Sequence, residues 1–261
     1  RQSRRPVGLV PHARVAAGAA EIAAALDEAS ARGEVLVIVD AVSEADLVAV
    51  AAACAGRPLL TGGSGIAMGL PQNFLAQGLA QAGEGTFEGV SGPEAILAGS
   101  CSRATLEQIA LHRQAHPSLH AAVEDVLSGA VTAEHLVSFI VEHRGREPLV
   151  YSSDEPEKVA AAQRKHGAAA VAHGIETLFA ETARALVETG IRRLVVAGGE
   201  TSGAVVSALD LDALDIGPEI DPGVPVLIHR GDRTLGLALK SGNFGTPDFF
   251  TKALKALGGR T

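Results

Sequence analysis

Three segments of the sequence share one plan: an apolar run typical of a buried strand, then a turn rich in Gly and Ser, then a helical pattern. They are RPLLTGGSGIAMGL at residues 57–70, EAILAGSCSRATLEQIALH at 94–112 and RRLVVAGGETSGAVVSAL at 192–209. Strands that alternate with helices in this way predict an α/β fold built on a parallel sheet, with ligands at the carboxyl ends of the strands. The Gly/Ser turns are therefore the predicted ligand sites.

Other segments predict the rest of the fold. Apolar runs at 35–40 and 148–153 predict further buried strands. Ala-rich stretches predict the covering helices, since Ala, Leu, Glu and Arg are strong helix formers; they are 16–31, 46–54 and 159–189, the last broken or bent at Gly167 and Gly174. VPVLIHRGDRTLGLALKSG at 224–242 predicts a β-hairpin that turns at Gly231-Asp232. The Gly-rich stretch 78–93 lacks apolar periodicity and predicts a linker between two domains.

The charge balance limits the classes of partner. The chain of 261 residues has 22 Lys+Arg against 30 Asp+Glu, a net charge of -8, which is the wrong sign for a nucleic-acid-binding protein. Its apolar runs are far shorter than the roughly 20 residues that span a bilayer. Two cysteines, Cys54 and Cys101, and no export signal favour the reducing cytoplasm, and we expect both thiols to be buried and inert. Association into a homo-oligomer is left open.

Dinucleotide binding and nucleophilic catalysis both fit the turns poorly. In TGGSGIAMG at 61–69 the third glycine of the G-x-G-x-x-G spacing is replaced by Met68. Ser64 and Cys101 lack the glycine two residues later that a nucleophile elbow needs. We therefore expect neither NAD binding nor a hydrolase.

Three histidines, His112, His116 and His120, recur every four residues. Pro117 should end the helix that carries them, and the sequence offers no nearby Cys or carboxylate to complete a compact ligand set. We expect surface histidines and no metal site.

Phosphate binding fits best. AGSCSRAT at 98–105 and AGGETSGA at 197–204 combine small residues, hydroxyl groups and a helix N-terminus, which suits the phosphates of a nucleotide. Neither is a Walker A loop, and helix capping by Ser102, and by Thr201 or Ser202, would explain either turn alone.

Two charged residues at these turns admit two interpretations each. Glu200 reaches a Mg²⁺ ion through water or accepts a bond from a sugar hydroxyl, or else its charge merely favours the helix N-terminus. Lys240, which precedes the turn SGNFG, serves a phosphate as a point charge or is an exposed lysine at the end of a hairpin.

Several long motifs, in one order, resemble the four-carbon acid sugar kinase family. They are VVAGGETSGAV at 195–205, IGPEIDPGVPV at 216–226 and LALKSGNFGTPDFF at 237–250, preceded by GLVPHARVAAGA, VDAVSEADL, PLLTGGSGIAMGL and LAGSCSRATLEQIA. The resemblance covers essentially the whole chain. It implies phosphoryl transfer from ATP, with Mg²⁺, to the terminal C4 hydroxyl of a four-carbon sugar acid, with 3-oxo-tetronate ahead of threonate or erythronate.

The resemblance also implies site residues and domains. ATP contacts are expected at Ser100, Gly198, Gly199, Glu200, Thr201 and Gly242. The family's opening Asp-Asp motif is absent, which implies that the front of the protein is missing. Residues 1–78 would then be the carboxyl-terminal part of the sugar-acid-binding domain, 79–89 a linker and 90–261 the nucleotide-binding domain.

The catalytic base is left unassigned by the resemblance. Asp221 and Glu219 are candidates only because GPEIDPG looks like a rigid acidic loop. Two alternatives stay open: a catalytically incomplete ATP-binding fragment, and a sugar-acid-binding protein without a nucleotide site.

Overall fold

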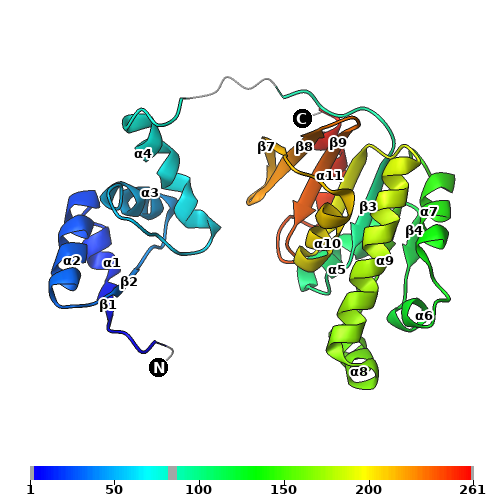
Figure 1. Ribbon diagram of the computed structural model, residues 1–261, viewed down its shortest axis with the longest axis horizontal. Coiled ribbons are helices and arrows are strands. Elements are labelled where there is room, and N and C mark those ends of the chain that lie inside the picture. The colour runs from blue at the N-terminus through cyan, green and yellow to red at the C-terminus, as the bar shows by residue number, and fades with distance from the viewer. Residues whose placement is uncertain (1–2, 82–86, 260–261) are drawn as a thin grey trace. The chain divides into compact units, whose positions relative to one another are not determined.

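The computed structural model describes residues 3–81 and 87–259, and the chain divides into two units, Arg1–Gly85 and Thr86–Thr261 (Figure 1). In the first unit, strands β1 (Val7–Val10) and β2 (Leu36–Val39) pair in parallel. The remaining elements of this unit are helical: α1 (His12–Val15), α2 (Ala19–Ala31), α3 (Glu44–Ala53), the 3₁₀ helix η1 (Ser64–Gly69) and α4 (Leu70–Ala76).

The first unit has a small core in which α2 and α3 pack beside the two strands. Ile22 and Ala25 of α2 meet Val50 of α3 and Val10 of β1 there. Helix α3 begins where the sequence supplies a cap, because the Ser43 hydroxyl accepts a hydrogen bond from the backbone N–H of Asp46 in a reciprocal capping box. The start of α3 is therefore fixed by a local signal in the sequence.

The strand predicted at the start of residues 57–70 is wrong. No strand occurs in 57–63, and the segment continues into η1 and α4. Pro58 has no N–H to offer a neighbouring strand, and Leu59 is 81% exposed. A short apolar run cannot by itself be distinguished from an irregular segment.

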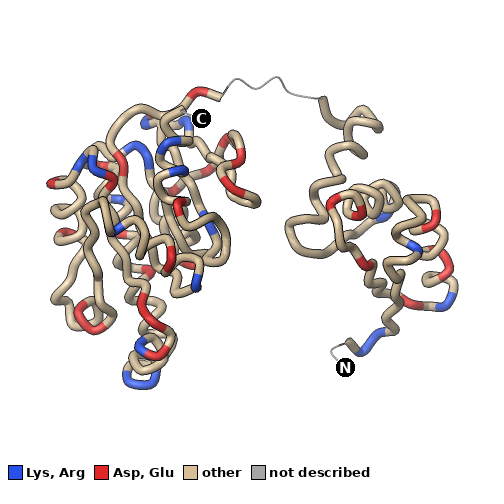
Figure 2. The backbone as a smooth tube through the Cα atoms, turned by 180° about the vertical axis from the view of Figure 1, so that it is seen from behind, with Lys and Arg blue, Asp and Glu red and all other residues tan. Residues whose placement is uncertain are grey.

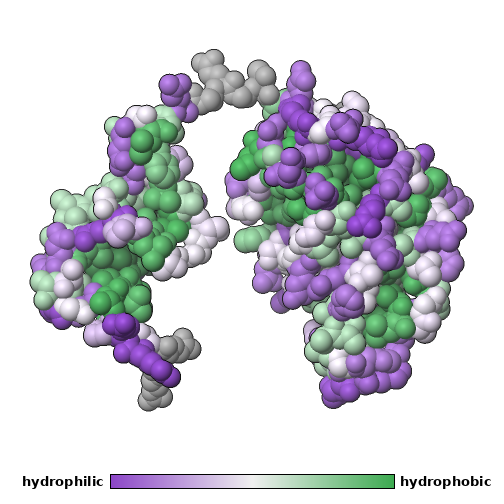
Figure 3. Space-filling model, viewed as in Figure 1, coloured by the Kyte–Doolittle hydropathy of each residue, from purple (hydrophilic) through white to green (hydrophobic). Residues whose placement is uncertain are grey.

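Apolar side chains reach the surface of the first unit (Figure 3). Val35, Leu36 and Ile38, in and before β2, are all exposed, as is Leu9 of β1. A group of this kind is typical of a surface that another segment or molecule covers.

A seven-stranded sheet forms the second unit, in the order β4-β5-β3-β6-β9-β8-β7. All neighbouring pairs from β4 to β9 are parallel, whereas β8 pairs antiparallel with both β9 and β7. The strands are β3 (Glu94–Ala98), β4 (Ser118–His120), β5 (Leu149–Tyr151), β6 (Arg193–Ala197), β7 (Asp215–Asp221), β8 (Val224–Arg230) and β9 (Thr234–Lys240). The predicted α/β class and the hairpin around residues 231–233 are confirmed.

Helices cover both faces of this sheet, as Figure 1 shows. They are α5 (Arg103–His112), α6 (Val123–Leu127), α7 (Ala133–Glu142), α8 (Pro156–His166), α9 (Ala168–Glu188), α10 (Gly199–Leu209) and α11 (Phe249–Leu257). Successive residues of a strand point to opposite faces. Accordingly, Ile96 of β3 packs in the cluster that holds residues of α5 and α11, and Leu97 in the cluster that holds residues of α7, α9 and α10.

Two glycines predicted to interrupt the long Ala-rich helix behave differently. Gly167 separates α8 from α9 with a φ of 88°, a conformation that favours glycine. Gly174 lies inside α9 without a break, and a methyl group there would meet the side chain of Leu127. The predicted break occurs at Gly167 but not at Gly174, where the glycine makes room for a neighbouring helix.

Most of the acidic segment GPEIDPG, residues 217–221, is a strand rather than a loop, and only Pro222 and Gly223 form a turn. Residues 215–221 form β7, which pairs with β8 through an irregular register. An edge strand can contain Pro218 because its outer side needs no hydrogen-bond partner.

Lys and Arg are interspersed with Asp and Glu along both units in Figure 2. Within residues 3–81 and 87–259, no helix is both long and apolar enough to cross a membrane.

Candidate nucleotide-binding site

Three turns meet where β3, β6 and β9 end. These strands are parallel neighbours, so their carboxyl ends lie at one edge of the sheet. The N–H of Ser100 donates to the carbonyl of Ala197 (3.2 Å), and the N–H of Gly198 donates to the carbonyl of Lys240 (2.9 Å). The predicted segments around Ser100, Gly198 and Gly242 are thus brought together.

The first turn of α5 is bonded to the turn after β9. Ser102 caps α5 by accepting from the N–H of Thr105, as the alternative capping interpretation of this turn requires. The same Ser102 hydroxyl donates to the carbonyl of Gly242 (2.6 Å), and the Thr105 hydroxyl also donates to that oxygen (3.0 Å). Capping therefore accounts for only part of what Ser102 does.

The glycines allow this close approach. A methyl group on Gly242 would overlap the Ser100 hydroxyl. Gly198 has a φ of 131°, and a methyl group there would lie 3.0 Å from Thr201 Oγ1 and 3.1 Å from the Ser100 nitrogen. By contrast, Gly199 faces open space: apart from its chain neighbours and the backbone of α10, no atom of the described residues lies within 4 Å of the position of an added Cβ.

Helix α10 begins at this junction without a side-chain cap. Gly198 is its N-cap residue, so neither Thr201 nor Ser202 caps the helix. The first N–H groups of an α-helix have no partner within the helix, and they attract anions. The Thr201 side chain is buried, whereas Glu200 is exposed in the same turn. The carboxylate thus stands at the open side of a turn whose free donors suit phosphate.

Lys240 is not the exposed lysine that one interpretation required. Its side chain is 1% exposed, and its ammonium group donates to Thr105 Oγ1 (2.9 Å), to the carbonyl of Gly242 (2.9 Å) and to that of Ser241 (3.3 Å). All three acceptors are neutral. Burial lowers the pKa of Lys240 to about 8.

The turn after Lys240 is held by a buried carboxylate. Asp221 accepts from the N–H (2.8 Å) and the hydroxyl (3.0 Å) of Thr246 and forms an ion pair with Lys252. Burial would raise the pKa of Asp221, but these bonds outweigh it and lower the pKa. Glu219 accepts from the N–H of Gly223 (2.7 Å) in the turn between β7 and β8. Asp221 therefore supports the loop, and its oxygens are already engaged.

Sequence reasoning missed Gln108. Its amide nitrogen lies 3.1 Å from each of three successive carbonyl oxygens, those of Phe244, Gly245 and Thr246. The signal was available, because Gln108 falls with Thr105, Ile109 and His112 on the buried face of α5. A polar residue on such a face needs hydrogen-bond partners.

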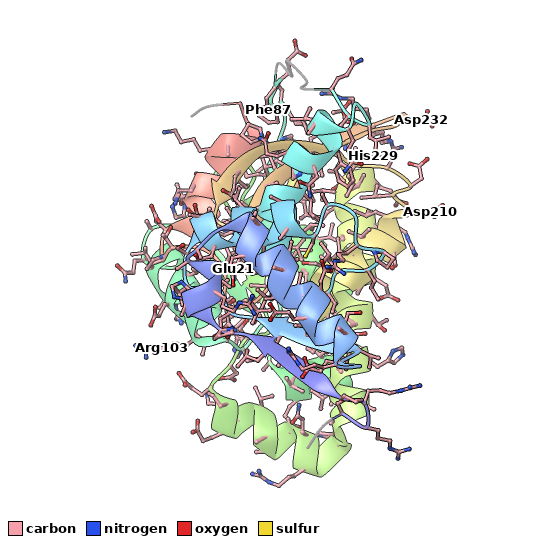
Figure 4. All side chains as sticks on the ribbon, turned by 90° about the vertical axis from the view of Figure 1, so that its left-hand side faces the viewer. Glu21, Phe87, Arg103, Asp210, His229 and Asp232 are labelled. Carbon is pink, nitrogen blue, oxygen red and sulfur yellow. The ribbon has the colours of Figure 1, made fainter. Side chains whose placement is uncertain are left out.

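Cys101 and Arg103 flank the same turn. Cys54 is buried, but Cys101, which directly precedes the cap residue of α5, is only half-buried, so its predicted burial is wrong. Arg103 points into solvent, with 93% of its side chain exposed, and pairs with Glu107 (2.9 Å) (Figure 4).

The histidine predictions need correction as well. His112 is buried against Phe250, and its Nε2 is 2.8 Å from the carbonyl oxygen of Glu147. Glu147 supplies the carboxylate that the sequence did not reveal, since the ligand atoms of His112, His116 and Glu147 lie within 4.8 Å of one another. However, the two imidazoles are stacked at 4.3 Å with planes 13° apart, so their in-plane lone pairs do not converge on one point.

The residues around these turns match a known domain. Residues 95–250 match the family model described as a nucleotide-binding C-terminal domain, and residues 1–70 match a sugar-binding N-terminal domain. The chain belongs to the four-carbon acid sugar kinase family. The expected membership is thereby confirmed.

Relatives named 3-oxo-tetronate kinase are similar to this family member over nearly its whole length. Those of Pseudomonas fluorescens and Cupriavidus necator are both 45% identical, over 99% of this chain and 60% of their own. A solved Salmonella typhimurium structure is 35% identical with a TM-score of 0.78, over 98% of this chain and 61% of that one. This member of the four-carbon acid sugar kinases thus spans about 60% of the length of the curated relatives it matches.

Proposed function

We propose that this chain is the ATP-binding part, with a portion of the sugar-acid-binding part, of a cytoplasmic kinase. The kinase would transfer a phosphoryl group from ATP to the C4 hydroxyl of a four-carbon sugar acid, 3-oxo-tetronate, to give its 4-phosphate. The observation that carries the proposal is the meeting of three turns, from residues 99–102, 198–201 and 241–245, at the carboxyl ends of adjacent parallel strands. The names of the relatives support the choice of substrate.

The domain assignment is part of the proposal. We assign residues 1–78 to the sugar-acid-binding domain, 79–89 to a linker and 90–261 to the nucleotide-binding domain. The exposed apolar residues of β1 and β2 would be covered by the remainder of the first domain.

The turns would hold the triphosphate in distinct ways. The backbone N–H groups of Gly199, Glu200 and Thr201 would donate to phosphate oxygens, with Gly198 shaping the turn. The Ser100 hydroxyl and the backbone at Gly242 would add contacts from the other two strands. Lys240 would act through its charge from behind Gly242, because its three N–H groups already have acceptors.

Glu200 fits a Mg²⁺ ion, since it is an exposed carboxylate beside donors that suit phosphate. Mg²⁺ in kinase sites is held by one or two carboxylates, waters and substrate phosphates, and it would neutralise charge on the transferred group. The remaining task of the protein is to align the acceptor hydroxyl with the phosphorus. Asp221 is engaged with Lys252 and Thr246, so we do not assign it as the base that accepts the hydroxyl proton.

The nucleotide proposal is tested by calorimetric titration of the 261-residue chain with a non-hydrolysable ATP analogue and Mg²⁺, with NAD as the control ligand. Gly199→Trp fills the open space at the start of α10 and should weaken binding of the analogue by about tenfold or more. Ser207→Trp, an exposed position two turns later on α10, should leave binding unchanged. Equal affinities of the two variants would contradict the nucleotide site.

The substrate proposal is tested with a protein that spans the whole length of the curated relatives, of which the present chain covers about 60%. ATP consumption measured with 3-oxo-tetronate, threonate and erythronate should be fastest with 3-oxo-tetronate. A faster reaction with threonate or erythronate would replace the proposed acceptor without affecting the nucleotide site. If the present chain binds the ATP analogue without turnover, the incomplete ATP-binding fragment is the better description of this chain.

A further inference from the structure

A cavity of about 550 Å³ opens at the amino ends of β3 and β6, in the second unit. The first residues of these strands, Glu94 and Arg193, lie side by side in the register of the sheet, and both line the cavity. The glycine turns follow the carboxyl ends of the same two strands, so the length of a five-residue strand, about 13 Å, separates the cavity from them. A ligand bound here would therefore occupy a site distinct from the proposed nucleotide site.

Arg193 is fixed in the wall of this cavity by three hydrogen bonds. It donates through Nε to the carbonyl of Gly92 (2.9 Å), through Nη1 to the carbonyl of Leu254 (3.0 Å) and through Nη2 to the carboxylate of Glu94 (2.7 Å). The Glu94 side chain is only 5% exposed, so the carboxylate end of this ion pair is buried. A guanidinium has five N–H groups, and the remaining two of Arg193 are left for a ligand.

Glu147, on the loop between α7 and β5, forms another part of the wall. Its φ of 55° lies in the left-handed region, which is uncommon for a residue other than glycine. Its backbone is held there, because its N–H donates to Glu94 (3.2 Å) and its carbonyl oxygen lies 2.8 Å from His112 Nε2. The Thr251 hydroxyl donates to one carboxylate oxygen of Glu147 (3.1 Å), and the other oxygen accepts no hydrogen bond from a described residue. Strained residues that are held in this way are concentrated at ligand sites.

Helix α11 sets the order of the charges along the cavity. Thr251 and Lys255 are four residues apart, so they share a face of the helix, and both line the cavity. The Glu147 carboxylate is bonded at Thr251, whereas the guanidinium of Arg193 is bonded one turn later, at the carbonyl of Leu254. Lys255, at this later turn, is exposed and forms no ion pair with a described residue. The cavity thus has a negative end and a positive end, about 5 Å apart along the helix axis.

This distribution of charge decides the class of ligand. A simple anion would be repelled by Glu147, and a simple cation by Lys255. A sugar acid would meet the two cations with its carboxylate but would offer Glu147 only hydroxyl groups. A zwitterion satisfies both ends with charge-assisted hydrogen bonds. Val90 and Leu254, both buried, line the cavity as well and suit a short hydrocarbon chain between the two charged groups.

We propose that this cavity binds a small amino acid, with the ammonium group of the ligand at Glu147 and its carboxylate between Lys255 and Arg193. Its carbon chain packs on Val90 and Leu254. Three methylene groups in an extended chain separate the two charged groups by about 5 Å, which matches the spacing of the two ends. The site takes no part in phosphoryl transfer, so this proposal does not rest on the proposed function.

Calorimetric titration of the 261-residue chain with 4-aminobutyrate tests the class of ligand. Butyrate lacks the ammonium group and butylamine lacks the carboxylate, and both should bind about tenfold or more weakly than 4-aminobutyrate. Absence of 4-aminobutyrate binding, or equal binding of butyrate, would overturn the proposal. Equal binding of 4-hydroxybutyrate would show that the site takes hydroxy acids instead. Tighter binding of L-alanine would overturn the assigned separation of the charges.

Lys255→Gln tests the position of the ligand carboxylate. The side chain is exposed, so the variant should fold. It should weaken 4-aminobutyrate by about threefold or more without weakening butylamine, which has no carboxylate. Arg164→Gln, an exposed position on α8 outside the cavity, is the control and should change neither. Equal weakening of both ligands, or of neither, by Lys255→Gln would contradict this position.

Glu147→Gln tests the position of the ligand ammonium group. The glutamine retains an oxygen that accepts from the Thr251 hydroxyl, so the wall should keep its shape. The variant should weaken 4-aminobutyrate by about threefold or more without weakening butyrate. Glu134→Gln, exposed on α7, is its control. Unchanged 4-aminobutyrate binding in Glu147→Gln would remove the ammonium group from this end.

The nucleotide site and the amino-acid site fail independently. Gly199→Trp lies at the opposite edge of the sheet and should leave 4-aminobutyrate binding unchanged. If it abolishes 4-aminobutyrate binding, the ligand is bound at the glycine turns and the amino-acid site is wrong. If the parent chain binds 4-aminobutyrate but not the ATP analogue, the nucleotide proposal alone is wrong.

Discussion

The ammonium group of Lys240 lies 2.9 Å from Thr105 Oγ1 and joins the end of β9 to the first turn of α5 across 135 positions of the sequence. Both groups also donate to the carbonyl of Gly242. A buried cation, a helix start and a glycine turn are thereby fixed to one another, and no carboxylate among the described residues is bonded to the cation. The turn after β9 is thus positioned from its buried side, which leaves its outer side open to a ligand.

Because Lys240 is buried, we expect the free energy of unfolding to rise with pH. Burial lowers the pKa of Lys240 from 10.5 to about 8, so between these values the unfolded chain holds a proton that the folded chain has released. The free energy of unfolding therefore increases with pH across this window, by roughly 3 kcal/mol in all. Lys240→Met lacks this titration, so the parent should gain stability relative to the variant between pH 7 and pH 10.

Urea unfolding followed by tyrosine fluorescence measures this difference. The chain has one tyrosine, Tyr151 in β5, and no tryptophan, so the signal reports the second unit. If the difference in the free energy of unfolding between parent and variant stays constant from pH 7 to pH 10, Lys240 does not titrate in this range.

Alanine should cost much more stability at Gly198 than at the adjacent Gly199. Gly198 has a φ of 131° and close neighbours on the side of a Cβ, so Gly198→Ala should cost about 1–3 kcal/mol in the free energy of unfolding. Gly199→Ala meets no atom within 4 Å and should change stability by less than about 1 kcal/mol. Tyrosine-monitored unfolding compares them, and equal losses would contradict the geometry of this turn.

Loss of the Asp221 carboxylate should lower the free energy of unfolding more than loss of the Asp215 carboxylate at the other end of β7. Asp221→Asn breaks a buried ion pair with Lys252, which is partly exposed, and should cost about 2 kcal/mol. Asp215→Asn breaks an exposed pair with Arg230 and should cost less than about 1 kcal/mol. Limited proteolysis should cleave residues 241–248 faster in Asp221→Asn only. Similar cleavage of both variants would argue against support of this loop by Asp221.

His112 predicts a loss of stability in mild acid. Burial lowers the pKa of His112 from 6.5 to about 4, despite a hydrogen bond to the Glu147 carbonyl that favours the charged form. Between pH 6.5 and 4 the unfolded chain binds a proton that the folded chain does not, so stability falls as the pH falls. The contribution between pH 7 and pH 5 is about 2 kcal/mol.

The measurement compares the parent with His112→Gln at pH 7 and pH 5 by urea unfolding. The variant should lack the acid-dependent loss, while His135→Gln, exposed on α7, should retain it. An unchanged loss in His112→Gln would assign the acid sensitivity to another group.

Local chemistry allowed much of the fold to be read from the sequence. The break at Gly167 and the hairpin around residues 231–233 each depend on a few neighbouring residues, and each was predicted correctly. Prediction failed where pairing with another strand decided the secondary structure. GPEIDPG has the composition of a loop, but pairing with β8 makes its residues 217–221 part of an edge strand.

The sequence by itself determined where strands end in Gly and Ser, and therefore which turns could bind an anion. Only the tertiary structure decided which of these turns meet, because the order β3-β6-β9 arises from pairing between strands about 40 to 100 residues apart. The same pairing buries Lys240 against Thr105, and the fold likewise places Glu147 beside His112. No local sequence pattern predicts these two contacts, since they form only when the whole sheet has formed.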